Sequence, residues 1–381
     1  MGVKKIFDKR LGLELPRLGF GVMRMPVLQN GKMDWNLGAR MVHRAFEDGV
    51  NYFDTAYPYH DGESQVFLAE TLRKYPRDSY YFASKLPTWM CKTNADVANI
   101  FNGQLADCKL DYFDFFLIHA LDQNRHDIMV NTGMHEYLME QKKTGRIRHL
   151  GFSYHGDHET FHRLIENFEW DFVMIQMNYV DDVMLNMREM YELLCKHDIP
   201  CFVMEPVRGG FLTKLPQEAL DEINNHPGEK LSPAAWALRW CIDKKNMPVI
   251  ISGMSDMAQV EENLKVFSDY PDKLTESETA LLNRTRDIML NTKTIPCTYC
   301  RYCMACPFGV DIPQMFEYYN QFKLFPNTFR GGVNYGLLTS ANKDYSSCTS
   351  CGACTPMCPQ HIDIPESLKQ VDKEMRPLLH N

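Results

Sequence analysis

Eight of the thirteen cysteines in this 381-residue chain lie in one short C-terminal stretch. They form two runs, Cys297 to Cys306 and Cys348 to Cys358, in which most cysteines recur at every third residue. Three thiols spaced in this way can face one centre from a single short loop. A disulfide framework is typical of small secreted chains, and neither the length nor the clustering fits one. The runs therefore predict metal sites in the last quarter of the chain.

The second run reads C-x₂-C-x₂-C-x₃-C-P, the spacing of bacterial ferredoxins, whereas the last gap of the first run is one residue shorter. In two-cluster ferredoxins the fourth cysteine of each run ligates the other cluster, so its spacing tolerates this change. We therefore expect two [4Fe–4S] clusters with crossed ligands. Cluster one takes Cys297, Cys300, Cys303 and Cys358, and cluster two takes Cys348, Cys351, Cys354 and Cys306.

Structural zinc is the alternative for these cysteines, because C-x₂-C also binds zinc. A zinc site would have two pairs separated by a long gap, whereas each run here places four cysteines within about ten residues. The long gap between the runs contains a helical pattern, which resembles the α-helical ferredoxin type of fumarate reductase iron–sulfur subunits. An Asp-Ile-Pro tripeptide follows each run, at 311–313 and 363–365, and indicates an internal duplication. The five scattered cysteines are expected to be small buried apolar residues.

Residues 11 to 290 show a different pattern, in which short apolar runs alternate with amphipathic stretches. The runs are continuous, as expected of strands buried on both faces of a parallel sheet. Eight strands that alternate with eight helices predict a (β/α)₈ barrel. The expected strands are 17–25, 51–56, 80–86, 112–120, 149–154, 172–179, 201–205 and 249–253. The expected helices are 37–48, 64–75, 95–109, 135–144, 158–167, 187–197, 233–243 and 257–267.

A doubly wound sheet is the alternative fold, but the glycines after the first strand, Gly19-Phe-Gly21, do not form its fingerprint. The change in composition near 290–296 predicts a barrel over 1–290 and a ferredoxin-like domain over 291–381. Thr93 is in the position to cap the third helix.

Charge and hydropathy exclude several classes of protein. The net charge is −8 and no basic block is present, so we expect no nucleic-acid partner. The longest apolar stretch, 115–121, is too short to span a membrane, and no apolar signal core follows the first lysines. We therefore expect no membrane partner and a cytoplasmic location.

Chemistry in a (β/α)₈ barrel takes place at the C-terminal ends of the strands. Asp54, Lys85 and His119 fall at three such ends, and Tyr59 lies in the loop after Asp54. Reduction of a carbonyl by hydride needs a proton donor, and a nearby ammonium lowers the pKa of a tyrosine by stabilising its phenolate. A carboxylate orients that ammonium, and an imidazole hydrogen-bonds the carbonyl oxygen. These four residues are therefore the candidate catalytic groups.

The stretch Phe53-Asp54-Thr55-Ala56-Tyr57-Pro58-Tyr59 resembles the signature of the aldo-keto reductases. The resemblance to this family as a whole covers about residues 5 to 270. Lys85 and His119 fall where that family keeps its lysine and histidine. Tyr57 is the alternative to Tyr59, and the five-residue step from Asp54 favours Tyr59. The whole chain resembles a prokaryotic subgroup with a C-terminal iron–sulfur extension.

The resemblance implies that NADH or NADPH binds across the barrel mouth without a Rossmann fold. The implied contacts are Ser153 and Gln176 for the carboxamide, Glu205, Arg208, Gly209 and Gly210 for the pyrophosphate, and Gln259, Glu262 and Asn263 for the adenine. Two positions depart from the family pattern. Tyr154 stands where the family usually has an asparagine, and Met204 or Glu205 stands where it has the aromatic residue that stacks on the nicotinamide. Gly253 and Gln259 stand where basic residues would bind a 2′-phosphate, which predicts NADH preference or weak discrimination.

A nicotinamide transfers two electrons as hydride, whereas an iron–sulfur cluster transfers one at a time. The sequence therefore predicts a reductase of an aldehyde or ketone, or an alcohol dehydrogenase in reverse, whose clusters exchange electrons with a partner protein or a flavin relay. A second hypothesis is a reductase whose clusters are structural or sense redox state. A third is an electron-transfer or redox-sensing protein without carbonyl turnover.

Overall fold

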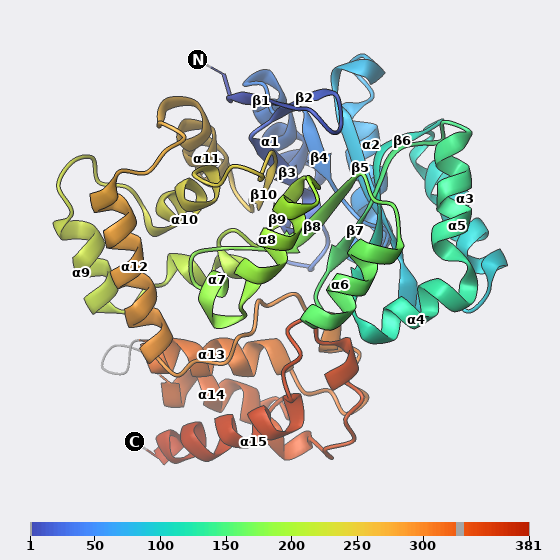
Figure 1. Ribbon diagram of the computed structural model, residues 1–381. Helices are drawn as coiled ribbons and strands as arrows, with labels where there is room; N and C mark the ends of the chain where they lie inside the picture. Colours follow the sequence, from blue (N-terminus) through green and yellow to red (C-terminus); the bar gives the residue numbers. More distant parts are fainter. Residues whose placement is uncertain (1, 325–330, 381) are drawn as a thin grey trace. The chain divides into compact units, whose positions relative to one another are not determined.

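The computed structural model describes residues 2–324 and 331–380 (Figure 1). Residues 325–330 and 381, which the predicted second domain includes, lie outside the described part. The chain divides into two compact units, the first made of Met1–Pro206 with Ala235–Thr275 and the second of Val207–Ala234 with Glu276–Asn381. These two units do not coincide with the predicted domains, 1–290 and 291–381, because residues 207–234 and 276–290 belong to the second unit. The domain boundary near residue 290 stays a prediction.

Eight parallel strands of the first unit form a closed barrel, in which β10 pairs with both β9 and β3. The predicted (β/α)₈ barrel is confirmed, because every predicted apolar run overlaps one of these strands. The strands are β3 (Leu18–Gly21), β4 (Tyr52–Asp54), β5 (Tyr81–Pro87), β6 (Phe113–Leu121), β7 (Ile147–Tyr154), β8 (Phe172–Gln176), β9 (Cys201–Met204) and β10 (Ile250–Gly253).

The helices that connect these strands follow the predicted amphipathic stretches. At the start of α3, the Thr93 hydroxyl accepts a hydrogen bond from the backbone N–H of Asp96, and the Asp96 carboxylate accepts one from the N–H of Thr93. This capping box satisfies two N–H groups that have no partner inside the helix. The predicted helices are α1 (Trp35–Glu47), α2 (Glu63–Leu72), α3 (Asn94–Cys108), α5 (Met134–Lys143), α6 (His158–Asn167), α8 (Met187–Lys196), α10 (Pro233–Ile242) and α11 (Met257–Asp269).

A β-hairpin that the sequence analysis did not predict closes the N-terminal end of the barrel. Leu15 of this hairpin is fully buried in one cluster with Tyr52, Phe115 and Phe172, which lie at or near the starts of their strands. Each such buried side chain contributes roughly 1.5–3 kcal/mol. The N-terminal ends of these strands are thus packed with apolar side chains, and the polar candidate residues lie at the C-terminal ends. The strands and α-helices of the first unit that were not predicted are β1 (Lys5–Asp8), β2 (Leu13–Pro16), α4 (Gln123–Thr132) and α7 (Asp181–Met184).

The second unit consists of helices and short turns. Residues of α13 and α15, including Phe316, Tyr319 and Leu368, form its core, and cysteines of both runs pack against it. The described residues of the gap between the runs form two α-helices, as the α-helical ferredoxin type predicts. In the part of the chain that the structure describes, we find no helix with the length and apolar character to cross a membrane. The helices are α9 (Gln217–Asn225), α12 (Glu276–Asn291), α13 (Ile312–Leu324), α14 (Gly331–Ser340) and α15 (Ile364–Met375).

The duplicated Asp-Ile-Pro tripeptides mark two helix starts of the second unit. The Asp363 carboxylate accepts a hydrogen bond from the N–H of Glu366 at 3.3 Å, and Asp311 accepts one from Gln314 at 3.4 Å. In each case the isoleucine begins the helix and the proline follows, where its missing N–H costs no helical hydrogen bond. Each cysteine run therefore leads into a helix that starts in the same way.

Candidate active site and cysteine cavities

A buried ion pair joins the ends of two neighbouring barrel strands. Lys85 Nζ of β5 donates to Asp54 Oδ1 of β4 at 2.5 Å and to the Thr55 carbonyl oxygen at 2.8 Å. Both side chains are almost fully buried. Burial lowers the pKa of Lys85 and raises the pKa of Asp54, and each partner works against the shift of the other. Because Asp54 Oδ2 is buried without a hydrogen-bond partner among the described residues, the ion pair only partly offsets the cost of burying the carboxylate.

Tyr59 is placed against this ion pair by a tight turn after β4. The turn, Tyr59–Gly62, contains left-handed residues, with φ values of 49° at His60 and 55° at Asp61. Lys85 Nζ lies 5.0 Å from the centre of the Tyr59 ring. Tyr59 is buried, whereas Tyr57 is half-buried and forms no hydrogen bond or ring contact with the ion pair in the part of the chain that the structure describes. This geometry favours Tyr59 over Tyr57 as the tyrosine of the site.

His119 of β6 completes the group. Its ring lies 5.7 Å from the ring of Tyr59, at an interplanar angle of 80°, and 5.2 Å from the ring of Trp89. Burial lowers the pKa of His119 well below its usual range, and the charges of Lys85, His155 and Arg125 lower it further. The imidazole is therefore neutral at neutral pH, and one of its ring nitrogens carries a hydrogen to donate. The structure thus brings all four candidate catalytic residues together.

A buried amide network that the sequence analysis missed lies next to Lys85. The Gln104 side chain of α3 donates to the Gln65 carbonyl oxygen, the Ser84 hydroxyl and the Lys85 backbone carbonyl, each at 3.1 Å. All three side chains of the network are buried. The network fixes the end of β5 and hence the direction of the lysine. Nothing in the spacing of the two glutamines along the sequence indicates this role.

The residues expected to contact the carboxamide already have partners within the barrel. The Ser153 hydroxyl accepts a hydrogen bond from the N–H of Ala120 at 2.8 Å, next to His119. Gln176 donates to Asp181 at 2.7 Å. Both residues are buried, and these bonds hold their side chains in fixed orientations. The Ser153 hydrogen and the Gln176 oxygen still have the chemistry to bind an amide.

The residues expected near the adenine lie at the start of α11. Asp256 caps this helix, because its carboxylate accepts from the backbone N–H of Gln259 at 2.9 Å, and the Gln259 side-chain oxygen accepts from the N–H of Ser255 at 2.9 Å. Asn263 is buried and donates to Ser252 at 2.7 Å. The side chain of Glu262 forms no hydrogen bond with the described residues.

Arg24 is a site residue that the sequence analysis missed, although it follows the strand-end rule that found Asp54. Its side-chain carbons fill the space beside Gly253, since a Cβ built there would lie 3.3–3.4 Å from them. Its guanidinium lies 3.6 Å from the carboxylate of Glu205. Arg24 therefore lies beside Gly253, the position where the family would have a basic residue. Its positive charge is already paired with Glu205.

Arg208, Gly209 and Gly210 belong to the second unit rather than to the barrel unit. They open a turn, Arg208–Thr213, in which all three adopt left-handed backbone conformations, with φ values of 49°, 64° and 91°. Arg208 is almost fully buried.

Two cavities of the second unit are each lined by four cysteines. One is lined by Cys297, Cys300, Cys303 and Cys358, and the other by Cys306, Cys348, Cys351 and Cys354. Each set therefore combines three cysteines of one run with the last cysteine of the other. Four thiols around one cavity are the donor set that a [4Fe–4S] cluster requires, so the residues fit the group.

The two runs also share backbone geometry. Tyr299 and Ser350, each two residues after the first cysteine of a run, have φ values of 57° and 56°. The backbone N–H of each donates to the sulfur of that cysteine, Cys297 or Cys348, at 3.4 Å. The predicted duplication is thus present in three dimensions, and each loop turns back around its own first sulfur.

Burial and crowding raise the pKa of several of these cysteines. Burial raises the pKa of the Cys297 thiol to about 12, and Cys300 and Cys358 add to the shift. The pKa of Cys354 is raised by burial and by Cys306, Cys348 and Cys351. Apart from Glu317, which also raises the pKa of Cys297, the named groups that raise each pKa belong to the same cavity. Bound iron would offset this rise in pKa, because a metal ion stabilises the thiolate.

Comparison with known proteins defines the class to which this barrel and these cavities belong. The model of the aldo/keto reductase family matches residues 17–285, and the model of the 4Fe-4S dicluster domain matches residues 296–363. The chain belongs to the aldo/keto reductase family and carries a C-terminal 4Fe-4S dicluster domain.

Similarity to individual relatives is low. A probable aldo-keto reductase 1 from Glycine max is 24% identical over 150 residues, which cover 37% of this chain but only 42% of that protein. The holo form of aldo-keto reductase AKR11C1 from Bacillus halodurans has a TM-score of 0.62 and 22% identity, over 74% of this chain and 96% of its own. An aldo-keto reductase from Klebsiella pneumoniae, solved in complex with NADPH, has a TM-score of 0.61 and 20% identity, over 74% of this chain and 95% of its own. These structures share the barrel fold.

Proposed function

We propose that the barrel reduces an aldehyde or ketone with NAD(P)H, or oxidises the alcohol in reverse, at Asp54, Tyr59, Lys85 and His119. One observation carries the proposal: Lys85 Nζ lies between the Asp54 carboxylate, 2.5 Å away, and the Tyr59 ring, 5.0 Å away. An ammonium held in this way stabilises a phenolate, and that is what a tyrosine needs to act as a proton donor.

When bound, NAD(P)H would supply the hydride for the carbonyl carbon. Tyr59 donates its hydroxyl proton to the carbonyl oxygen as negative charge develops there. Lys85 stabilises the phenolate that remains, and Asp54 keeps Lys85 charged against the cost of burial. His119 is neutral, so it donates a hydrogen bond to the same oxygen without a net charge of its own.

For the nicotinamide cofactor, we propose contacts from Ser153, Gln176, Glu205, Arg208, Gly209, Gly210, Gln259, Glu262 and Asn263. The NADPH bound by the Klebsiella pneumoniae neighbour supports a nicotinamide cofactor in this fold. The ion pair between Arg24 and Glu205 supports NADH preference or weak discrimination, because Arg24 already has a carboxylate partner beside Gly253. Equilibrium binding of both cofactors tests this, and a clearly tighter Kd for NADPH would contradict it.

In the second unit we propose two [4Fe–4S] clusters with crossed ligands, held by the two sets of four cysteines that line its cavities. Bound clusters would accept and release single electrons. A redox partner protein or a bound relay would exchange those electrons with the chain. Cluster binding and carbonyl reduction are separable, because their proposed residues share no member.

Replacing Tyr59 by Phe tests the catalytic proposal, because Phe keeps the ring and removes the proton. We expect NAD(P)H-dependent reduction of a simple aldehyde to fall by about 10²–10⁴-fold in kcat, the usual contribution of a general acid. Tyr57→Phe is the matched control and should keep most of the activity. Iron content should be unchanged in both variants.

Undiminished activity of Tyr59→Phe would show that Tyr59 is not the proton donor. A wild-type chain with full iron content and no aldehyde reduction would favour the alternative function, an electron-transfer or redox-sensing protein on the same scaffold. The two cavities lined by four cysteines each are the observation that keeps this second candidate in view.

A further inference from the structure

The two cysteine cavities differ in how far they are open to solvent. Each of the four cysteines proposed for cluster one is half-buried, whereas Cys351, proposed for cluster two, is exposed. Arg301 is the single exposed residue among those that line the cavity of cluster one. The cavity of cluster two has five exposed lining residues, Pro307, Phe308, Thr349, Cys351 and Ala353. A cluster bound in the second cavity would therefore be the more accessible of the two.

The exposed edge of the cluster-two cavity is uncharged and partly apolar. The residues that line this cavity include no acidic, basic or histidine side chain. Phe308 contributes an aromatic ring whose exposed fraction is 46%. A charged group that was buried against this edge would lose its water and gain no ion partner. The edge therefore favours a partner whose own contact face is uncharged.

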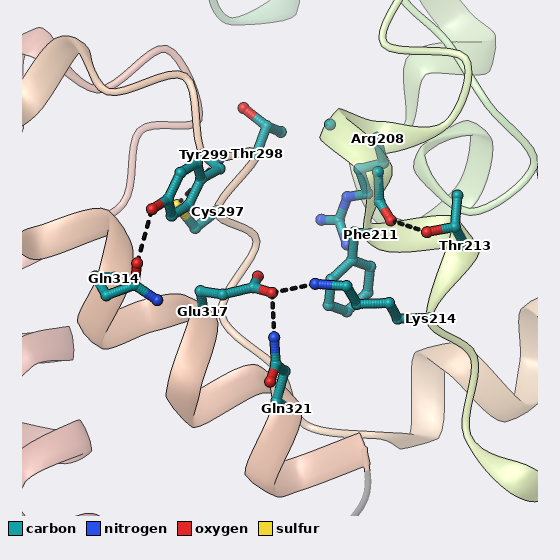
Figure 2. Close-up of a pocket in the computed structure, with 12 residues that line it drawn as sticks. Arg208, Phe211, Thr213, Lys214, Cys297, Thr298, Tyr299, Gln314, Glu317 and Gln321 are labelled. Atoms are coloured by element: carbon teal, nitrogen blue, oxygen red, sulfur yellow. Dashed lines mark hydrogen bonds and ion pairs between the residues drawn. The ribbon is translucent and has the colours of Figure 1, made fainter. Parts of the chain in front are cut away.

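The surroundings of cluster one are charged instead. Lys214 forms an ion pair with Glu317 in the wall of a further cavity that Cys297 also lines (Figure 2). Tyr299 lines the same wall, and its hydroxyl donates to Gln314 at 2.8 Å. A partner that approached Cys297 from this side would have to bury or break the ion pair, a cost that the edge of cluster two does not impose.

We propose that the chain exchanges electrons with a one-electron carrier at the exposed edge of the cluster-two cavity, beside Phe308 and Cys351, and that the contact face of the carrier is uncharged. The inference rests on the two clusters of the proposed function. One electron passes from the reduced cluster held by Cys351 to the oxidised centre of the carrier. No covalent bond forms or breaks, and no proton moves with the electron.

Cluster one is then the inner member of the pair. Cys303 and Cys306 are three residues apart in the chain, and they line the cavities of cluster one and cluster two respectively. Three residues of chain span at most about 11 Å, so one short loop joins the two cavities. An electron from cluster one therefore has a short route to the exposed cluster.

Oxidation of the reduced clusters by chelates of different charge tests the site. The full chain, purified without air and with its iron in place, is reduced and mixed with anionic hexacyanoferrate(III), cationic hexaammineruthenium(III) or neutral tris(acetylacetonato)cobalt(III). Thr349 is exposed and lines the cluster-two cavity, so it is the place to add a charge. At low salt, Thr349→Lys should speed oxidation by the anion and slow oxidation by the cation, each by about threefold to tenfold. Thr349→Glu should do the reverse.

Opposite effects on the two charged chelates separate contact from a changed reduction potential, which would move both rates in the same direction. Phe308→Ala should slow oxidation by the neutral chelate by about threefold and leave the charged chelates within about twofold, because it removes apolar contact alone. Arg301→Gln is the matched control, since it removes an exposed charge at the cavity of cluster one. It should leave all three rates within about twofold.

Release of iron to a chelating agent gives a readout that does not depend on electron transfer. We expect two phases of about four irons each, and the faster phase should come from cluster two because its cavity is the more exposed. Cys306→Ser should abolish the fast phase, and Cys297→Ser should abolish the slow one.

Opposite shifts of the charged chelates in Arg301→Gln, with none in the Thr349 variants, would overturn the proposal and place the exchange at cluster one. Equal shifts at both positions, an unchanged neutral rate in Phe308→Ala, or a fast phase that remains in Cys306→Ser would also overturn it. A wild-type chain with clearly fewer than about eight irons would refute the two clusters on which the inference rests. Aldehyde reduction that depends on Tyr59 would stand in each of these cases.

Discussion

The barrel site and the cysteine cavities solve the same problem, how to hold reactive groups in place, by different means. In the barrel the strand register holds them: Asp54 pairs with Ala83, and Lys85 with Leu117, across adjacent strands. In the second unit, loops with left-handed residues at Tyr299 and Ser350 carry the thiols. Asp54, Lys85 and His119 are fixed by their own sheet, whereas burial raises the pKa of thiols such as Cys297 and Cys354. We infer that the barrel is folded without any bound group and that the second unit depends on its clusters.

The largest effect expected from this difference is loss of iron from the second unit. Cys297→Ser and Cys358→Ser should each remove one cluster, about four of eight irons, because each removes a proposed ligand of cluster one. The barrel should stay folded, since no strand is touched. Iron content, the visible spectrum and circular dichroism measure these outcomes.

Double variants then test whether the ligands cross between the runs. With crossed ligands, Cys297→Ser with Cys358→Ser should lose no more iron than either single variant. Cys297→Ser with Cys306→Ser should lose both clusters, although both changes lie in one run. The reverse pattern would show that each run serves its own cluster. Cys195→Ser, in α8 of the barrel unit, is the control and should keep all the iron.

The same contrast explains what could be predicted from the sequence. The cysteine spacing is local, so it led to the two sets of four that line the cavities. Asp54, Lys85 and His119 were found because each ends an apolar run in a fold whose strand ends share one face. Arg24 satisfies the same rule and was missed because no motif marks it. The Gln104 network and the packing of 207–234 with the cysteine unit depend on contacts between distant segments, which neither spacing nor periodicity records.

Acid should lower the free energy of unfolding of the barrel by an amount on the order of 1 kcal/mol. Burial lowers the pKa of His119 in the folded barrel, so the unfolded chain takes up its proton first as the pH falls. Stability from this group is complete above the unfolded pKa of about 6.5 and is lost progressively below it. We expect the free energy of unfolding of the barrel to fall between pH 7 and pH 5.

His119→Asn should flatten this dependence, because the variant has no buried imidazole to protonate. Urea unfolding followed at several pH values measures it. His162→Asn, which removes an exposed histidine of α6, is the control and should keep the wild-type slope. A slope that is the same in His119→Asn would show that other groups, such as the half-buried His149, dominate the acid response.

The smallest expected effects come from helix caps, and they test whether the two units unfold separately. Thr93→Ala removes the capping box of α3 in the barrel, and Asp363→Ala removes the cap of α15 in the cysteine unit. Each change should cost about 1 kcal/mol, or a shift of roughly 2–4 °C in Tm. If the units are independent, calorimetry of the iron-loaded protein will show two transitions, with Thr93→Ala shifting only one and Asp363→Ala only the other. A single transition that both variants lower would mean that the barrel and the cluster-bearing unit unfold together, so the stability of the barrel would then also depend on the clusters.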